Sequence, residues 1–152
     1  MGRLQLAIDV GNLDEAIDFY SKLFSTPPTK VKEGYANFAI ADPPLKLVLF
    51  EKPGRGGTLN HLGVEVETSA EVVAAEARIT SEGLDTTGVG DALCCFAEKT
   101  ETWVHAPDEV RWEWYVKTGD SDQFADVQLG GSTVAECCAV PEAEATVADC
   151  CG

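Results

Sequence analysis

One pattern of predicted elements occurs twice in this chain, and it limits the possible folds more than any other feature. Residues 4–10 alternate apolar and polar side chains, which predicts a strand, and residues 12–24 have the apolar spacing of a helix. A strand followed by a helix returns at residues 60–67 and 69–81. Short predicted strands follow each helix: 29–33, 34–41 and 45–51 in the first half, and 85–88, 92–99, 101–105 and 111–116 in the second. The sequence therefore predicts two βαβββ modules, the second with a strand to spare, and an α+β fold.

The two modules are expected to form one domain over residues 1–117, with boundaries near 1–52 and 58–117. Between them the chain reads Lys-Pro-Gly-Arg-Gly-Gly, a composition that is typical of a linker. Residues 118–152 contain seven acidic residues and no Lys or Arg, and they lack apolar periodicity. We expect this last segment to be a disordered acidic tail that carries cysteines.

The charge and hydropathy of the chain exclude several classes of partner. The net charge of −15 argues against nucleic acid and against anionic membrane surfaces, since both attract basic patches. No window of about 18 apolar residues is present, so no membrane span is expected. The N-terminus lacks the charged and apolar regions of a secretion signal. We therefore expect a cytoplasmic protein whose thiols stay reduced.

The six cysteines form three adjacent pairs: Cys94-Cys95, Cys137-Cys138 and Cys150-Cys151. A disulfide framework spaces its cysteines along the chain, and structural zinc sites usually use C-x-x-C spacing, which is absent. Adjacent thiolates instead suit a thiophilic ion held by two sulfur atoms, because soft ligands select soft metals and metalloids. For any single pair, the alternative interpretation is two small buried apolar side chains.

Three polar side chains stand out by their register or by their apolar setting. Gln5 and His61 lie 56 residues apart, each seven residues before the predicted strand-to-helix turn of its module. Glu113 lies between two tryptophans, so a strand would point it away from both indoles. A carboxylate in such an apolar setting is costly unless a partner such as a metal neutralises it. A surface histidine and a solvated glutamine are the plain alternatives for the other two.

Several stretches resemble the vicinal oxygen chelate proteins, which include glyoxalases, extradiol dioxygenases and antibiotic-resistance binding proteins. These stretches are Leu4-Gln-Leu-Ala-Ile-Asp-Val, Asn12-Leu-Asp-Glu-Ala-Ile-Asp-Phe-Tyr20, Asn60-His-Leu-Gly-Val-Glu-Val and Trp112-Glu-Trp-Tyr115. The resemblance covers residues 4–117. It implies that the two modules form a cupped mixed sheet around a divalent metal.

A narrower set of residues is similar to the carbon–arsenic bond lyases, whose close relatives include cadmium-induced proteins. The set comprises Gly34-Tyr-Ala-Asn-Phe-Ala-Ile-Ala-Asp-Pro-Pro-Leu-Lys-Leu-Val-Leu49, the stretch that begins at Asn60, and Cys94-Cys95. This likeness implies a non-haem iron(II) enzyme that uses dioxygen to release arsenite from methylarsonous acid and trivalent aromatic arsenicals. It also implies that iron is bound by Gln5, His61 and Glu113, and arsenic by Cys94 and Cys95. Residues 98–110 depart from the turns that are typical of that family.

The chemistry of these residues agrees with such a reaction. One imidazole, one carboxylate and one amide oxygen make a variant facial triad, which leaves positions on iron open for dioxygen and substrate. Two thiolates can hold trivalent arsenic and leave its carbon substituent free to face the iron. Because adjacent residues of a regular strand point to opposite faces, Cys94 and Cys95 are expected on a bulge or loop.

Two other functions remain open from the sequence alone. The first is a thiol-based protein that sequesters cadmium or arsenite without turnover, which the paired cysteines suit equally well. The second is a glyoxalase-like lyase or an extradiol dioxygenase, both of which usually carry His or Glu where Gln5 stands. The sequence does not predict the organic substituent on arsenic, the oligomeric state, or the role of the four cysteines after residue 118.

Overall fold

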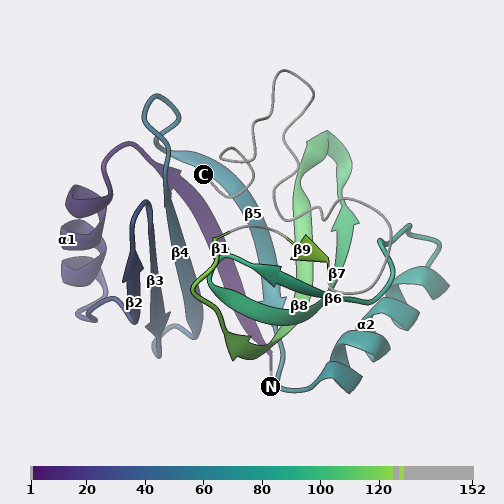
Figure 1. The fold of residues 1–152 in the computed structure, drawn as a ribbon. Helices are drawn as coiled ribbons and strands as arrows, with labels where there is room; N and C mark the ends of the chain where they lie inside the picture. The colour runs from purple at the N-terminus through teal and green to yellow at the C-terminus, as the bar shows by residue number, and fades with distance from the viewer. Residues whose placement is uncertain (1, 125–126, 129–152) are drawn as a thin grey trace. The chain divides into compact units, whose positions relative to one another are not determined.

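The computed structural model describes residues 2–124 and 127–128, and the chain divides into two compact units (Figure 1). One unit is Arg3–Gly63, and the other contains the described residues from Val64 onward together with Gly2. The division falls within strand β5 (Thr58–Glu65). His61, although it begins the second module in the sequence, therefore belongs to the first unit.

The first unit is a mixed sheet with one helix. Its strand order is β2-β3-β4-β1-β5, in which β1 is parallel to β4 and the pairs β2–β3 and β3–β4 are antiparallel. Helix α1 (Leu13–Leu23) begins after its cap Asn12, whose side chain accepts a hydrogen bond from the Glu15 N–H. The strands before β5 are β1 (Arg3–Val10), β2 (Lys30–Lys32), β3 (Tyr35–Ile40) and β4 (Leu45–Glu51).

Strand β1 is buried on both of its faces. Leu6 and Ile8 pack against the core that α1 covers, whose buried members are Val10, Leu13, Ala36, Phe38, Ile40, Leu47 and Leu49. The alternate residues Gln5, Ala7 and Asp9 point to the opposite face and are no more than 2% exposed. Two polar side chains therefore lie inside the protein, where they need hydrogen-bond partners.

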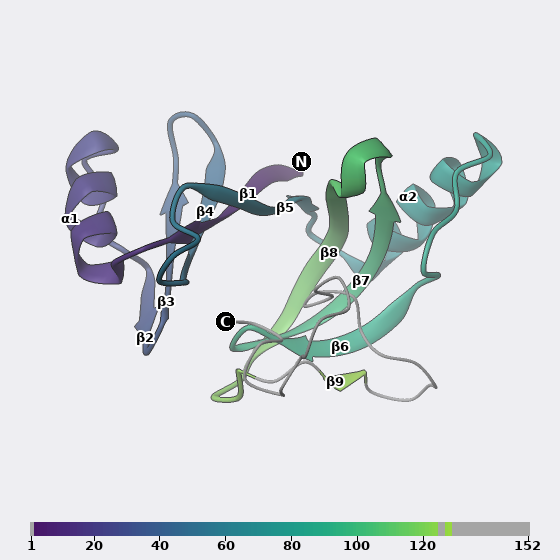
Figure 2. The same cartoon turned by 90° about the horizontal axis from the view of Figure 1, so that it is seen from above.

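The second unit is an antiparallel sheet with the order β8-β7-β6-β9 and one covering helix (Figure 2). Helix α2 (Ser69–Ser81) begins with a capping box between Thr68 and Glu71, and it packs on β7 and β8. Its other elements are β6 (Gly90–Cys94), β7 (Ala97–His105), the short 3-10 helix η1 (Pro107–Glu109), β8 (Arg111–Asp120) and β9 (Val127–Gln128). No helix among the described residues has the length and apolar character needed to cross a membrane.

The predicted helices and the strands of the first half are confirmed to within two residues, but four ranges of the second half are corrected. Residues 85–88 do not form a strand, and only the isolated bridge between Thr86 and Val104 occurs there. The strand predicted over 92–99 ends at Cys94, and the strand predicted over 101–105 begins four residues earlier, at Ala97. The last strand continues to Asp120, because its pairing with β7 extends beyond the apolar stretch that predicted it.

The hairpin of β6 and β7 turns through Cys95 and Phe96, between the paired residues Cys94 and Ala97. Both turn residues have left-handed backbone conformations, with φ angles of 55° and 63°. Hairpin turns of this hand favour pairs such as Asn-Gly, so Cys-Phe gives no turn signal in the sequence. The conformation costs each residue about 1 kcal/mol and needs support from outside the turn. The expectation that the cysteine pair lies on a bulge or loop is confirmed for Cys95, whereas Cys94 is the last residue of β6.

The residues after β8 return to this turn and hold it. The Phe96 N–H donates to the Gln123 carbonyl, and the Ser121 N–H donates to the Phe96 carbonyl, both at 3.1 Å. The centroids of the Phe96 and Phe124 rings lie 5.2 Å apart. Residues 121–124 therefore pack within the second unit, although the sequence placed them in the tail. Residues 125–126 and 129–152 of the predicted tail, with Cys137, Cys138, Cys150 and Cys151, lie outside the described residues.

Replacing Phe124 with Ala is expected to loosen the turn that carries the thiols, because it removes the aromatic contact with Phe96. The free energy of unfolding should fall by about 1–2 kcal/mol, and a chromogenic aromatic disulfide should react faster with Cys95. The control is Gln123→Ala, because this side chain is exposed and the hydrogen bond from Phe96 is accepted by the backbone carbonyl, which the substitution keeps. Both variants are measured with the four later cysteines changed to serine. Equal reaction rates would contradict the proposed support.

Candidate active site

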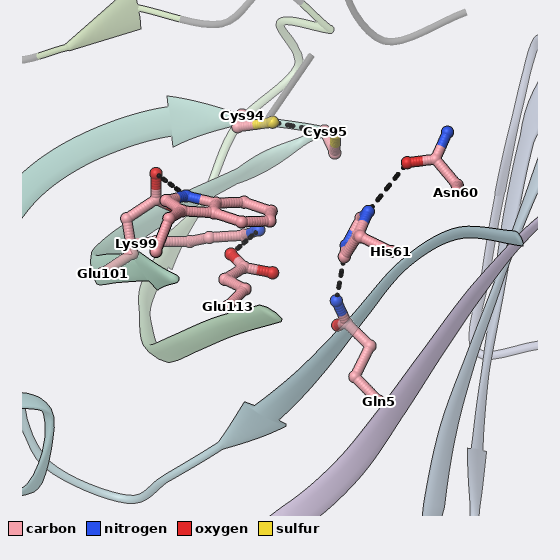
Figure 3. Close-up of polar contacts among 9 residues, drawn as sticks. Gln5, Asn60, His61, Cys94, Cys95, Lys99, Glu101 and Glu113 are labelled. Atoms are coloured by element: carbon pink, nitrogen blue, oxygen red, sulfur yellow. Dashed lines mark hydrogen bonds and ion pairs between the residues drawn. The ribbon is translucent and has the colours of Figure 1, made fainter. Parts of the chain in front are cut away.

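The candidate metal ligands of the first unit lie on β1 and β5, where a chain of hydrogen bonds orients them (Figure 3). Gln5 and His61 are 2% and 4% exposed. The Gln5 Nε2 amide donates to His61 Nε2 at 3.0 Å, and His61 Nδ1–H donates to Asn60 Oδ1 at 2.8 Å. Asn60 Nδ2 in turn donates to Asp9 Oδ1 at 3.0 Å. The buried carboxylate of Asp9 is thus the last acceptor in this series of hydrogen bonds.

These hydrogen bonds fix the tautomer of the imidazole. With its proton on Nδ1 and held by Asn60, His61 keeps the Nε2 lone pair for a ligand, as metal-binding histidines do. Turning the Gln5 amide over would present its oxygen beside the same ring nitrogen. The two side chains therefore fit the neutral part of a donor set for a divalent metal.

The third candidate ligand, Glu113 on β8, lies in the second unit and is paired with a lysine. Its side chain is fully buried, and its Oε1 accepts a hydrogen bond from Lys99 Nζ at 2.6 Å. Burial alone lowers the pKa of Lys99, but the carboxylate of Glu113 leads a set of negative groups that raise this pKa well above its usual value. Lys99 Nζ also lies 4.6 Å from the centre of the Tyr115 ring. The buried carboxylate has the cation that its apolar setting requires, and this cation is an ammonium.

A second buried carboxylate, Glu101, lies on the same face of β7 as Lys99, two residues farther along. Its Oε1 accepts a hydrogen bond from Trp103 Nε1 at 3.0 Å, whereas its Oε2 has no hydrogen-bond partner among the described residues. Burial raises the pKa of Glu101 well above its usual value, the charge of Glu113 raises it further, and Lys99 acts in the opposite direction. One oxygen of the Glu101 carboxylate can therefore still accept a hydrogen bond within a buried cluster of charged groups.

The two thiols lie beside this cluster, at the end of β6 and in the turn that follows it. Cys94 is fully buried and Cys95 is half-buried, neither forms a disulfide, and their Sγ atoms lie 2.9 Å apart. Cys94 packs against Trp103, and Cys95 and Phe124 pack around that contact. Both thiols also raise the pKa of Lys99, so they are close enough to interact electrostatically with its ammonium. A single ammonium thus interacts with Glu113 and with the thiol pair.

The structure brings the predicted site residues together in two groups. Gln5 and His61 are in contact in the first unit, and Glu113, Cys94 and Cys95 share the second. Their assembly around one metal stays a prediction. Within residues 2–124 and 127–128, no three His, Cys, Asp or Glu side chains gather as a metal cluster.

Sequence reasoning missed four polar residues of these groups: Asp9, Asn60, Lys99 and Glu101. Asp9 shares its strand face with Gln5, so the period of two could have identified it. Asn60 could not be found this way, because it precedes His61 and the alternation assigns neighbours to opposite faces. In residues 98–101, charged residues with one threonine are typical of a solvated strand, which concealed the buried lysine.

Comparison with known proteins gives several matches. The family described as "Glyoxalase/Bleomycin resistance protein/Dioxygenase superfamily" matches residues 3–113. The "Cadmium-induced protein CadI" of Mycobacterium tuberculosis is 56% identical over 124 residues, which is 82% of each chain. The "Trivalent organoarsenical cleaving enzyme" of Thermomonospora curvata is 47% identical over 156 aligned positions, which cover 99% of this chain and 100% of the relative.

The solved structures show the same fold at much lower identity. Methylmalonyl-CoA epimerase from Mycobacterium tuberculosis superimposes with a TM-score of 0.55 at 19% identity, over 74% of this chain and 85% of the epimerase. This likeness concerns the fold alone, and it agrees with the two βαβββ modules predicted from the sequence. Since the family match spans residues 3–113 and relatives align over most of their length, the chain belongs to the glyoxalase/bleomycin resistance protein/dioxygenase superfamily and has its α+β vicinal oxygen chelate fold.

Proposed function

We propose that this protein is a non-haem iron(II)-dependent dioxygenase that cleaves the carbon–arsenic bond of trivalent organoarsenicals and releases arsenite. The observation that carries the proposal is the pair of adjacent thiols outside any disulfide, with Sγ atoms 2.9 Å apart at a two-residue turn. The Thermomonospora curvata relative, which is named for cleaving trivalent organoarsenicals, supports the substrate class. The proposed substrates are methylarsonous acid and trivalent aromatic arsenicals, and the proposed location is the cytoplasm, where thiols stay reduced.

Cys94 and Cys95 bind the arsenic atom in this proposal. A disulfide holds its sulfur atoms about 2.05 Å apart, so sulfur atoms 2.9 Å apart are separate thiols that can both bond to a third atom. Trivalent arsenic is soft and exchanges its oxygen ligands for thiolates, while its carbon substituent stays attached. Two sulfur–arsenic bonds fix the direction of the carbon–arsenic bond, which a single bond does not.

Neighbouring side chains assist the thiols. The ammonium of Lys99 interacts electrostatically with both sulfur atoms, and a positive charge stabilises the thiolates that bind arsenic. Trp103 packs against Cys94, and Phe124 lies in the same apolar cluster. This cluster keeps water away from one side of the thiol pair.

Gln5, His61 and Glu113 hold the iron(II) ion in this proposal. His61 offers the Nε2 lone pair that Asn60 maintains, Gln5 offers its amide oxygen, and Glu113 offers the negative charge. The donor types and their buried positions fit a divalent metal. The ion, when bound, supplies the activation of dioxygen that the cleavage requires.

A second candidate function is the sequestration of cadmium or arsenite by thiols without turnover. The observation in its favour is the 56% identity to a relative named as cadmium-induced. Adjacent thiols outside any disulfide bind a soft metal as well as they bind arsenic. Catalytic turnover separates the two functions.

The deciding experiment loads the protein with iron(II) under anaerobic conditions, adds methylarsonous acid and then admits air. The molar amount of arsenite released should exceed the molar amount of protein. Release should occur only when both iron and dioxygen are present. Tight arsenical binding without arsenite release would refute the enzymatic proposal and favour sequestration.

Changing both Cys94 and Cys95 to Ser should separate arsenic binding from metal binding. Calorimetry should show Mn(II) binding unchanged, because neither thiol is assigned to the metal. Binding of a trivalent phenylarsenical should be lost, because a hydroxyl is a hard and weakly acidic ligand. A double variant that loses Mn(II) would place the thiols in a metal site. A variant that keeps the arsenical would place the arsenic site elsewhere in the chain.

Replacing Asn60 with Ala should weaken metal binding through His61, because it removes the acceptor that keeps the ring proton on Nδ1. We expect Mn(II) affinity to fall about 10- to 100-fold, the usual effect of removing such an orienting partner. The control is Asn37→Ala, a half-buried asparagine of the same unit whose amide donates to the Tyr35 hydroxyl. Equal affinities in the two variants would show that Asn60 does not act on a metal ligand.

A further inference from the structure

We propose that Lys99 blocks Glu113 in the metal-free protein and transfers its ion pair to Glu101 when a divalent cation binds Glu113. Lys99 is then a positioning residue that sets the metal affinity, and Glu101 is the acceptor that allows it to move. This inference rests on the proposed function, because it takes Glu113 to be a metal ligand.

The closed ion pair carries the first step. Lys99 Nζ lies 2.6 Å from Glu113 Oε1, and the two side chains are 7% and 0% exposed. A metal ion that coordinates Glu113 brings two positive charges to the place that the ammonium occupies. Like charges repel strongly where water is excluded, so the ammonium beside Oε1 opposes coordination of a metal by this carboxylate. Metal binding therefore favours the departure of Lys99 from Glu113.

Glu101 is the acceptor within reach. It lies on the same face of β7, two residues from Lys99, and already interacts with it electrostatically. Trp103 Nε1–H donates to Glu101 Oε1 and so orients the carboxylate (Figure 3). Glu101 Oε2 has no hydrogen-bond partner among the described residues, so this oxygen can still accept one. The flexible four-carbon stem of lysine lets the ammonium change partners without a backbone movement. The Tyr115 ring gives the ammonium a second favourable contact.

Charge balance explains why two buried carboxylates accompany one lysine. Without metal, Lys99 neutralises Glu113. With metal, the ion neutralises Glu113, and the displaced ammonium needs a new counter-ion, because an unpaired buried charge is costly. Burial and the charge of Glu113 raise the pKa of Glu101 and favour its neutral form in the metal-free protein. Glu101 releases its proton and supplies the counter-ion when the ammonium moves to it, so no buried ammonium is left unpaired in either state.

The test measures Mn(II) binding to the full-length apo protein, because this hard cation avoids thiols. Free Mn(II) is followed by electron paramagnetic resonance. Lys99→Met removes the charge and keeps the stem, and it should bind Mn(II) about tenfold more tightly. Lys99→Arg keeps the charge and should stay close to wild type. The matched control is Lys117→Met, which removes an exposed lysine of β8 that pairs with Asp120 and should change nothing.

Glu101→Gln tests the acceptor. Mn(II) affinity should fall about tenfold, because the displaced ammonium loses its partner. In the double variant Lys99→Met with Glu101→Gln this penalty should disappear, since no ammonium remains to be placed. Unchanged or weaker Mn(II) binding in Lys99→Met overturns the proposal, and so does a Glu101→Gln penalty that persists in the double variant. If Lys99→Met fails to fold, Lys99→Gln replaces it and is interpreted in the same way.

Glu113→Gln distinguishes this inference from the proposed function. If it binds Mn(II) as tightly as wild type, Glu113 is not a metal ligand, and the metal assignment fails together with the role of Lys99. If it loses Mn(II) while Lys99→Met gains nothing, the metal assignment stands and only the role of Lys99 is overturned.

Discussion

A buried carboxylate needs a positive charge beside it, and in the second unit Glu113 imposes this condition on the elements around it. The register of β7 and β8 pairs Trp103 with Glu113, which places Lys99 on the same sheet face and within reach. The opposite face of these strands packs against α2 through Val72, Ala75 and Ile79. With both faces covered, removing either partner of the pair would leave an uncompensated charge inside the protein. The ion pair is therefore a structural requirement of the metal-free protein as well as part of its candidate active site.

The first unit also buries polar side chains, and there hydrogen bonds rather than an ion pair satisfy them. Its helix covers the face of β1 that carries Leu6 and Ile8, and the polar residues lie on the other face. There Asp9 holds Asn60, Asn60 holds His61, and His61 accepts from Gln5. In both units the candidate ligands lie on the sheet face away from the helix, which follows from the repeated strand–helix order. The repeat thus places neutral donors in one unit and the charged donor in the other.

The sequence predicts the repeated part of this architecture well, because that part follows from periodicity. Alternation identified β1 and β5, apolar spacing identified both helices, and equal register singled out Gln5 and His61, which a hydrogen bond joins. The prediction failed where contacts between residues far apart in the sequence determine the local structure. Cys95 and Phe96 turn the chain without a turn residue, because residues 121–124 support them. The burial of Glu113 was expected, but its lysine partner depends on a strand register that no local pattern encodes.

The left-handed turn at Cys95 also has a consequence for the size of what the thiols can hold. Neighbouring Cα atoms lie about 3.8 Å apart, whereas disulfides usually join residues whose Cα atoms are about 4.4–6.8 Å apart. Adjacent cysteines are therefore too close for a relaxed bond between their own sulfur atoms. The turn brings the sulfur atoms to 2.9 Å, short of a bond. A single atom bonded to both sulfur atoms lengthens the bridge between these neighbouring residues, so the backbone disfavours a sulfur–sulfur bond and favours a bridging element.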